Sequence, residues 1–162
     1  MLARRKVVRG GAGDGAPRIL LASEGREIPA AAVDLAAQLA ERERAKVYVL
    51  SIARVWGSGL GLPMPGLLPT KAEWDVQNAI VRSAVNTLKR RGVEAEGEVL
   101  GTRRAGRRIL DVAQQLGCSA IVMGAAGRRR TPMIGDWIWS QEPYRVERRA
   151  RRRGLAVHIV TG

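Results

Sequence analysis

Short runs of apolar residues alternate along the chain with longer segments whose apolar residues recur at helical spacing. Three runs are apolar at consecutive positions, as in strands buried on both faces: RILLAS (18–23), KVYVLSIA (46–53) and SAIVMG (119–124). A fourth segment, VEAEGEVL (93–100), alternates apolar and polar residues, which predicts a strand with one solvated face. The run LAVHIV (155–160) predicts a fifth and last strand.

The segments between these runs predict helices. Residues 28–45 follow the first strand, and Pro29 suits the first position of a helix there. Residues 70–91 restart a helix with Thr70 and Glu73 as a capping box, and Gly92 ends it. The apolar residues at helical spacing are Val33, Ala36, Ala37 and Ala40 in the first helix and Trp74, Ile80, Val81, Val85 and Leu88 in the second.

The remaining segments predict loops and shorter helices. Residues 54–68 hold four glycines and two prolines, so they predict an irregular loop. Residues 101–118 predict a turn and a short helix that Gly117 closes, and two short helical pieces split by Pro143 precede the last strand.

This order of elements predicts an α/β domain built on a five-stranded parallel sheet, with right-handed crossovers and helices on both faces. Ligands of such sheets bind beyond the carboxyl ends of the strands, at the switch point of the topology. We therefore expect Ser23–Arg26, Ile52–Arg54 and Gly124–Arg130 to surround one crevice.

Composition narrows the class of protein. A length of 162 residues with 46% hydrophobic and 27% charged residues predicts one soluble domain, 18–162, after a flexible, basic, Gly-rich arm at 1–17. The sequence has no apolar run of the roughly 18–20 residues that span a bilayer and no secretory signal. The single cysteine, Cys118, fits a reducing compartment, so we expect a cytoplasmic protein.

The formal net charge of +13 raises the question of an anionic partner. A basic surface attracts nucleic acid, anionic lipid or nucleotide phosphates. With two tyrosines, four tryptophans and no phenylalanine, the chain lacks the aromatic residues interleaved with arginine that stack on bases. Nucleic acid and membrane surfaces are therefore the least favoured partners.

Three segments carry a resemblance to the universal stress protein family, over nearly the full length from Arg18 to Thr161. RILLASEGRE resembles the first strand and its acidic turn, LGCSAIVMGAAGR resembles the fourth strand and the Gly-x2-Gly loop, and LAVHIV resembles the closing strand. The resemblance implies the strand order 3-2-1-4-5, a Rossmann-like fold of the adenine nucleotide alpha hydrolase type. It also implies a homodimer formed through the last strand, 155–160.

Members of this family that bind ATP or AMP carry Gly-x2-Gly-x9-Gly-(Ser/Thr), whose backbone amides and hydroxyl hold ribose and phosphates. Gly124 and Gly127 match the first half of this motif. The second half departs, because Gly135 comes after seven residues and Asp136 replaces the hydroxyl residue. A carboxylate there repels phosphate, and a helix cap is the simpler role for Asp136.

The resemblance implies an adenine nucleotide, with Mg²⁺ beside it, at the crevice. Glu24 would meet a ribose hydroxyl or be a solvated turn residue, and Ser23 could serve the turn instead. Arg128 and its two neighbours would clamp phosphates or be a solvated basic loop. The full candidate set is Ala22, Ser23, Glu24, Ile52, Met123, Gly124, Gly127, Arg128, Gly135 and Asp136.

Catalysis has little support in the sequence, so we expect no enzyme, with weak ATP hydrolysis left open. The single histidine, His158, lies in a predicted buried strand, where a core role is the simpler one. Cys118 has no histidine near it in sequence, and no Cys/His cluster indicates zinc.

Three functional hypotheses remain. The first is a stress-response or regulatory module that binds ATP or AMP at the Gly124–Gly127 loop. The second is a family member without nucleotide that acts as a protein-interaction or transporter-associated regulatory domain. The third is a basic surface that binds nucleic acid or anionic lipid.

Overall fold

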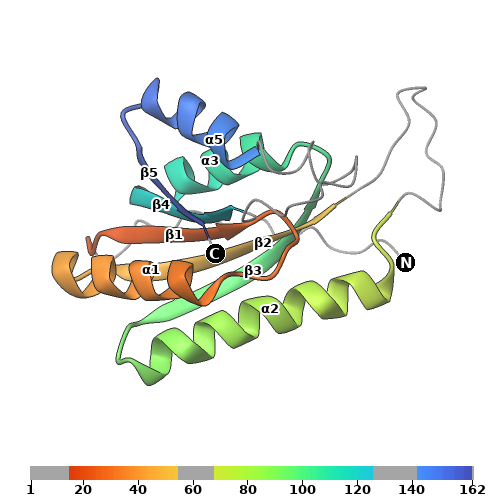
Figure 1. The fold of residues 1–162 in the computed structure, drawn as a ribbon, viewed down its shortest axis with the longest axis horizontal. Helices are drawn as coiled ribbons and strands as arrows, with labels where there is room; N and C mark the ends of the chain where they lie inside the picture. The colour runs from red at the N-terminus through yellow and green to blue at the C-terminus, as the bar shows by residue number, and fades with distance from the viewer. Residues whose placement is uncertain (1–14, 55–67, 126–141, 162) are drawn as a thin grey trace.

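A five-stranded parallel sheet with two helices on each face forms the structure, a computed structural model that describes residues 15–54, 68–125 and 142–161 (Figure 1). The strands are β1 (Arg18–Ser23), β2 (Lys46–Arg54), β3 (Ala95–Thr102), β4 (Cys118–Ala125) and β5 (Ala156–Thr161). The helices are α1 (Ala30–Glu43), α2 (Lys71–Arg90), α3 (Ala105–Gln115) and α5 (Glu142–Arg151). The predicted arm at 1–17 falls mostly outside the described residues, so the division at residue 18 stays a prediction.

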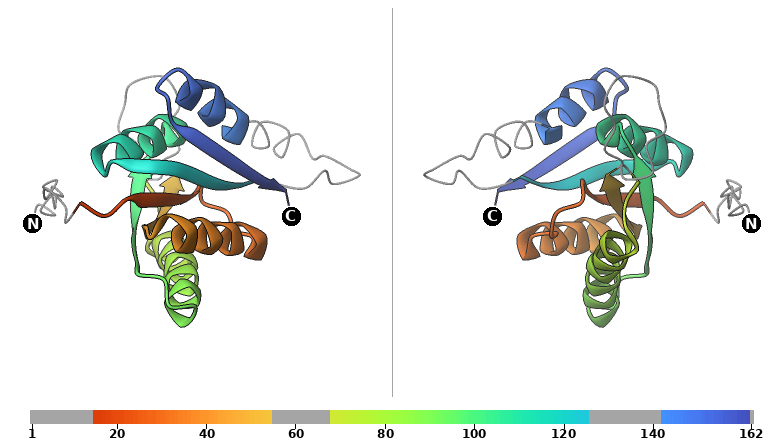
Figure 2. Two further views of the ribbon diagram at one scale, coloured as in Figure 1. Left: turned by 90° about the vertical axis from the view of Figure 1, so that its left-hand side faces the viewer. Right: turned by 90° about the vertical axis from the view of Figure 1, so that its right-hand side faces the viewer.

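The strand order is β3-β2-β1-β4-β5, which confirms the expected topology. All four pairings are parallel, with Ala22 level with Leu50 on one side and with Met123 on the other. Helices α1 and α2 cover one face of the sheet, and α3 and α5 cover the other (Figure 2). The chain therefore reverses its direction of winding between β1 and β4, the position at which such sheets bind ligands.

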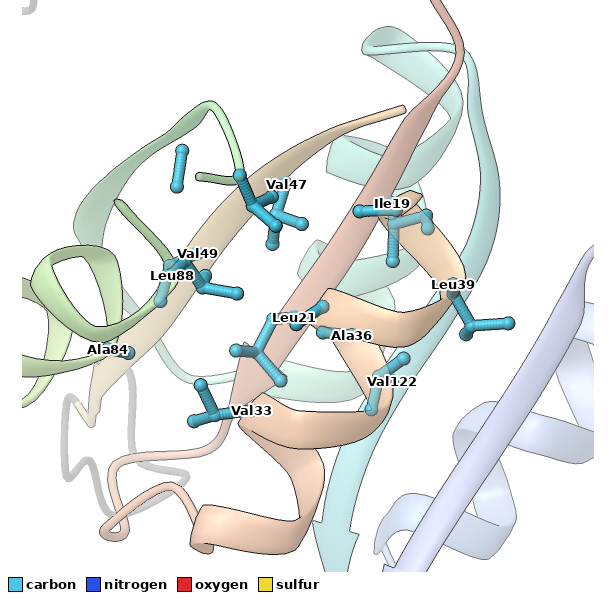
Figure 3. Close-up of a cluster of buried hydrophobic side chains, with 14 of the residues drawn as sticks. Ile19, Leu21, Val33, Ala36, Leu39, Val47, Val49, Ala84, Leu88 and Val122 are labelled. Atoms are coloured by element: carbon cyan, nitrogen blue, oxygen red, sulfur yellow. The ribbon is translucent and has the colours of Figure 1, made fainter. Parts of the chain in front are cut away.

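Two apolar clusters, one on each face of the sheet, form the core. In the first, Ile19 and Leu21 of β1 pack with Ala36 of α1 and Leu88 of α2, all fully buried (Figure 3). In the second, Leu20 of β1 packs on the α3 side of the sheet with other fully buried chains. Burying one such side chain stabilises the fold by about 1.5–3 kcal/mol, so β1 anchors both layers.

Helix α1 begins one residue later than the sequence predicts. Pro29 has φ −58° and ψ 141°, an extended conformation, so it precedes the helix and is not its first residue. Its carbonyl accepts hydrogen bonds from the backbone N–H groups of Ala32 and Val33. The predicted apolar residues of this helix, Val33 among them, are buried as expected.

Helix α2 starts with the predicted capping box. Thr70 Oγ1 accepts from the Glu73 N–H at 3.2 Å, and Glu73 Oε2 accepts from the Thr70 N–H at 2.6 Å. The buried positions of α2 are Gln77, Val81, Ala84 and Leu88. The buried face of the helix is therefore rotated relative to the predicted one. Trp74, Ile80 and Val85 are only half-buried.

The later elements shift by a few residues. Strand β3 starts at Ala95, two residues later than predicted, and α3 starts only at Ala105. Gly92 and Gly117 have φ of +80° and +64°, so both helix-ending glycines are confirmed. Pro143 lies in the first turn of α5, and the helical piece predicted before it lies outside the described residues.

Strand β5 is less buried than a central strand. It pairs only with β4, and its four middle residues, His158 among them, are half-buried. The prediction of a buried strand around His158 was therefore wrong in degree, because β5 is an edge strand whose middle residues are half-buried.

The capping box gives a test of the local signal at the start of α2. Thr70→Ala should lower the free energy of unfolding by about 1 kcal/mol, because it leaves the Glu73 N–H without its side-chain acceptor. Urea denaturation would measure this loss. Thr87→Ala is the control, since Thr87 lies inside the same helix, where alanine is the better helix former. Equal losses for both variants would contradict a capping role.

Candidate functional site

The described residues enclose a cavity at the carboxyl ends of β1 and β4. Its volume is about 60 Å³. This is enough for a few water molecules, whereas ligand pockets usually measure about 300–1,000 Å³. The lining residues come from the end of β1, the β1–α1 loop and the end of β4: Ala22, Ser23, Glu24, Arg26, Glu27, Ile28, Pro29, Gly124 and Ala125.

Ser23 fixes the turn that leaves β1. Its hydroxyl donates to the Arg26 carbonyl at 2.5 Å and accepts from the Arg26 N–H at 3.1 Å. The serine oxygen thereby satisfies both backbone groups of a residue three positions later, which closes the loop on itself. Turn chemistry, one of the two roles that the sequence left open for Ser23, is the role that these bonds give it.

Gly25 brings this loop against β2. Its φ is +94°, a conformation that L side chains rarely adopt. A Cβ atom there would lie 2.7 Å from the Ile52 carbonyl oxygen, which is backbone and cannot give way. Glycine is therefore required at this position by both conformation and space.

The Gln77 side chain of α2 links the β1–α1 loop to strand β2. Its Nε2 donates to the Gly25 carbonyl at 3.0 Å, and its Oε1 accepts from the Ser51 hydroxyl at 2.6 Å. Ser51 is completely buried and Gln77 is only 9% exposed. One amide thus joins the β1–α1 loop, β2 and α2, and each of its two ends has a partner of the right polarity. We call this chain of contacts the Gln77 bridge.

Gly124, the first glycine of the sequence motif, lies beneath Pro29. A Cβ atom at Gly124 would meet the proline ring, 2.7 Å from Cγ and closer still to Cδ. Glycine is therefore needed here for packing against the residue that precedes α1, independently of any ligand. The contact also fills part of the space directly over the end of β4.

Glu24 is the acidic residue at the end of β1. It is half-buried, and its Oε1 atom is shielded from solvent. Arg26 and Glu27 contribute opposite charges to the same lining. The cavity therefore combines a carboxylate acceptor with a guanidinium donor, a pair suited to hydroxyl and anionic groups of a ligand.

Four of the ten predicted site residues line the cavity: Ala22, Ser23, Glu24 and Gly124. Ile52 of β2 and Met123 of β4 do not line the cavity. Their side chains are 0% and 1% exposed, and they belong to the core cluster on the α3 side of the sheet. Of these two residues only Ile52 comes near the site, because its backbone carbonyl lies against Gly25 of the β1–α1 loop. The other four, Gly127, Arg128, Gly135 and Asp136, lie outside the described residues.

The sequence interpretation missed Pro29 as a cavity residue and Gln77 as its support. A signal existed for Gln77, because it stands four residues before Val81 in the stripe that faces the sheet. A polar residue at a buried helical position needs a partner. For Pro29 no comparable signal exists, since its contact with Gly124 joins two segments 95 positions apart.

Two described groups away from the cavity, Cys118 and Tyr48, have strongly shifted pKa values. Burial raises the pKa of the Cys118 thiol to about 11, with Arg18 opposing the shift. Burial, together with a hydrogen bond to Glu98, raises the pKa of Tyr48. Both groups stay protonated near neutral pH, and Cys118 is buried in the core cluster on the α3 side of the sheet.

Neither a metal site nor a membrane span is found in the described part of the chain. No group of three or more His, Cys, Asp or Glu residues could hold a metal ion there. None of its helices is both long and apolar enough to cross a bilayer.

Comparison with known proteins gives a family and a fold. The model of the family described as "Universal stress protein family" matches residues 16–134. No curated protein matches the sequence. Among solved structures, a universal stress protein family member from Burkholderia pseudomallei is 21% identical, with a TM-score of 0.62 over 91% of this chain and 98% of that one.

Two further similar structures are complexes. The universal stress protein from Archaeoglobus fulgidus with dAMP is 20% identical, with a TM-score of 0.59 over 89% of this chain and 96% of that one. A universal stress protein with cAMP is also 20% identical, with a TM-score of 0.59 over 90% and 97% of the two chains. At these identities the likeness shows the fold.

The Gln77 bridge gives a second test. Gln77→Leu should lower the free energy of unfolding by about 1–3 kcal/mol, because it leaves the buried Ser51 hydroxyl and the Gly25 carbonyl without their hydrogen-bond partner. In the double variant Gln77→Leu/Ser51→Ala the loss should be smaller than the sum of the two single losses. Gln38→Leu on the exposed face of α1 is the control and should change stability little. Additive single losses would show that the bridge does not couple the two residues.

The contact over Gly124 gives a third test. Gly124→Ala should lower the free energy of unfolding by about 1–3 kcal/mol, because the added methyl group overlaps the Pro29 ring. The same substitution in a Pro29→Ala background should cost clearly less. Thermal and urea unfolding of the four chains would measure both costs. An equal cost in both backgrounds would mean that the methyl group clashes elsewhere.

Proposed function

The chain belongs to the universal stress protein family, and from that premise we propose that it is a regulatory module that binds an adenine mononucleotide at the ends of β1 and β4. The observation that carries the proposal is the cavity that Glu24 and Gly124 share at the topological switch point. The dAMP and cAMP complexes of two similar structures support an adenine nucleotide as the ligand class.

Within this proposal the carboxylate of Glu24 accepts hydrogen bonds from ribose hydroxyl groups. A carboxylate is an acceptor only, so it pairs with hydroxyl donors and repels phosphate. Arg26, on the same lining, provides the complementary donor. The Gln77 bridge holds the loop that carries both side chains, so it acts as a positioning contact.

A monophosphate fits this chain better than a triphosphate. The glycine motif in the sequence is two residues shorter than the nucleotide-binding pattern, and Asp136 stands in place of a hydroxyl residue. A shorter loop has fewer backbone N–H groups for the β- and γ-phosphates, and its carboxylate repels them. We therefore infer that AMP binds at least as tightly as ATP, and that Mg²⁺ adds little.

A second candidate function rests on Pro29. Its ring occupies space over Gly124, and the cavity of about 60 Å³ is well below the size of a typical ligand pocket. This favours a family member that acts through protein contacts without a nucleotide, including a domain that works with a transporter. In both cases we propose a binding and regulatory role, not catalysis.

We also propose a homodimer formed through 155–160, in a cytoplasmic protein. Strand β5 is an edge strand with half-buried side chains, and the outward backbone of such an edge can pair with a second copy.

Calorimetric titration with AMP and with ATP, each with and without Mg²⁺, tests the nucleotide. AMP should bind in the micromolar to millimolar range, and Glu24→Gln should weaken it about tenfold, since a hydrogen bond to a charged group is worth about 1.5–3 kcal/mol. Glu41→Gln, an equal charge change at an exposed site near the far end of α1, is the control. No heat with either nucleotide up to millimolar concentration would leave the second candidate standing.

A further inference from the structure

The helical layer made of α3 and α5 carries most of the net positive charge of the described residues. With the flanking residues 103, 104, 152 and 153, these two helices contain ten arginines and three acidic residues. Helices α1 and α2, with their C-caps Arg44 and Arg91, contain seven basic and five acidic residues. The two faces of the sheet therefore differ strongly in charge. We call the first of them the α3/α5 layer.

Packing forces the arginines of α5 outward. Pro143, Val146 and Ala150 form its buried stripe, and the last two have no exposed surface at all. They join the core cluster on the α3 side of the sheet, and α3 and α5 lie next to each other there (Figures 1 and 2). With this stripe buried, the exposed face of α5 is mostly charged, and Tyr144 is its one exposed large hydrophobic residue.

Two arginines at and just after the end of α5 contact acidic or amide side chains. Arg151 pairs with Glu147 at 2.8 Å, and Arg153 lies 3.6 Å from Asp111 of α3 while it donates to Gln114 at 2.8 Å. The contacts of Arg153 join the C-terminal turn after α5 to α3. The exposed arginines of the layer are Arg103, Arg104, Arg107, Arg145, Arg148, Arg149, Arg151, Arg152 and Arg153.

Arg145, Arg148, Arg149 and Arg152 are spaced three and four residues apart, so they share one face of α5 and its C-terminal turn. Like charges at this spacing repel one another and weaken a helix. A polyanion laid along the face removes that repulsion. Arginine also suits phosphate groups in particular, because its planar guanidinium can donate two parallel hydrogen bonds to one phosphate.

We propose that the α3/α5 layer binds double-stranded nucleic acid through its phosphate backbone, without reading sequence. A helix of ten or eleven residues is about 15 Å long, and a DNA duplex carries one charge per about 1.7 Å of its axis. The layer thus meets several phosphates at once. Single strands are held by aromatic stacking, and Tyr144 is the one aromatic residue of these two helices, so the duplex is the fitting form.

An anionic membrane fits the layer less well. Helices that lie in a membrane interface bury an apolar face in it, and the apolar face of α5 is already buried against the protein. Of the three large hydrophobic residues exposed in the described chain, Leu68 and Val76 belong to the α2 region and Tyr144 alone to this layer.

Binding of a fluorescent 20-base-pair DNA duplex, followed by anisotropy between 50 and 200 mM salt, tests the proposal. The variant Arg148→Gln/Arg149→Gln/Arg152→Gln should bind at least tenfold more weakly at 50 mM salt. Its slope of log affinity against log salt should be smaller by about 2–3, since each phosphate contact contributes about 0.9.

The control variant is Arg42→Gln/Arg82→Gln/Lys89→Gln on exposed positions of α1 and α2, which removes the same three charges from the other face. It should keep wild-type affinity within about twofold, and both variants should keep the wild-type circular dichroism spectrum and melt at no lower temperature than the wild type. The proposal is overturned by no duplex binding at 50 mM salt, by equal losses in the two variants, or by tighter binding to the single strand. Tighter binding to vesicles of anionic phospholipid than to the duplex overturns it as well.

Discussion

The burial of β1 on both faces is the constraint on which the rest of the structure depends. Ile19, Leu20 and Leu21 are completely buried, and the strand pairs with β2 on one side and β4 on the other. A polar side chain in the middle of β1 would lie in the apolar core on either face of the sheet and would lose its hydration. The chain can therefore present chemistry from β1 only where the strand ends, and there Ser23 and Glu24 begin the cavity.

Close contacts of the backbone and of two side chains then decide the shape of that cavity. Gly25 lies against the Ile52 carbonyl, the Gln77 bridge holds the same loop from behind, and Pro29 covers Gly124. Interiors packed this closely shift little when one contact changes. The loop is thus held in one position before any ligand arrives, which lowers the entropic cost of binding. The same contacts also keep the cavity small.

Much of the fold could be predicted from local signals, whereas the site could be predicted only in part. Apolar runs located β1, β2 and β4, and the Thr70–Glu73 pair located the start of α2. The strand order came from the family resemblance, because periodicity within one segment carries no information on its neighbours. Pro29 and Gly124, or Gln77 and Gly25, meet only through the tertiary fold, so nothing at either position alone indicates the contact. Ile52 and Met123 were placed correctly on strands, but a strand residue faces core or cavity according to a register that the sequence leaves open.

The two proposed sites are also linked through electrostatics. Arg103 and Arg104 follow the carboxyl end of β3, and in a parallel sheet this end lies at the same edge as Ser23 and Gly124. Two strand spacings separate β3 from β1, which is about 10 Å. That distance is close to the Debye length at 0.1 M ionic strength, so these arginines contribute to the potential at the cavity mouth. A nucleotide phosphate at the edge and a duplex along the α3/α5 layer would draw on the same positive field. Each polyanion then weakens the attraction for the other, a reciprocal coupling that thermodynamic linkage requires.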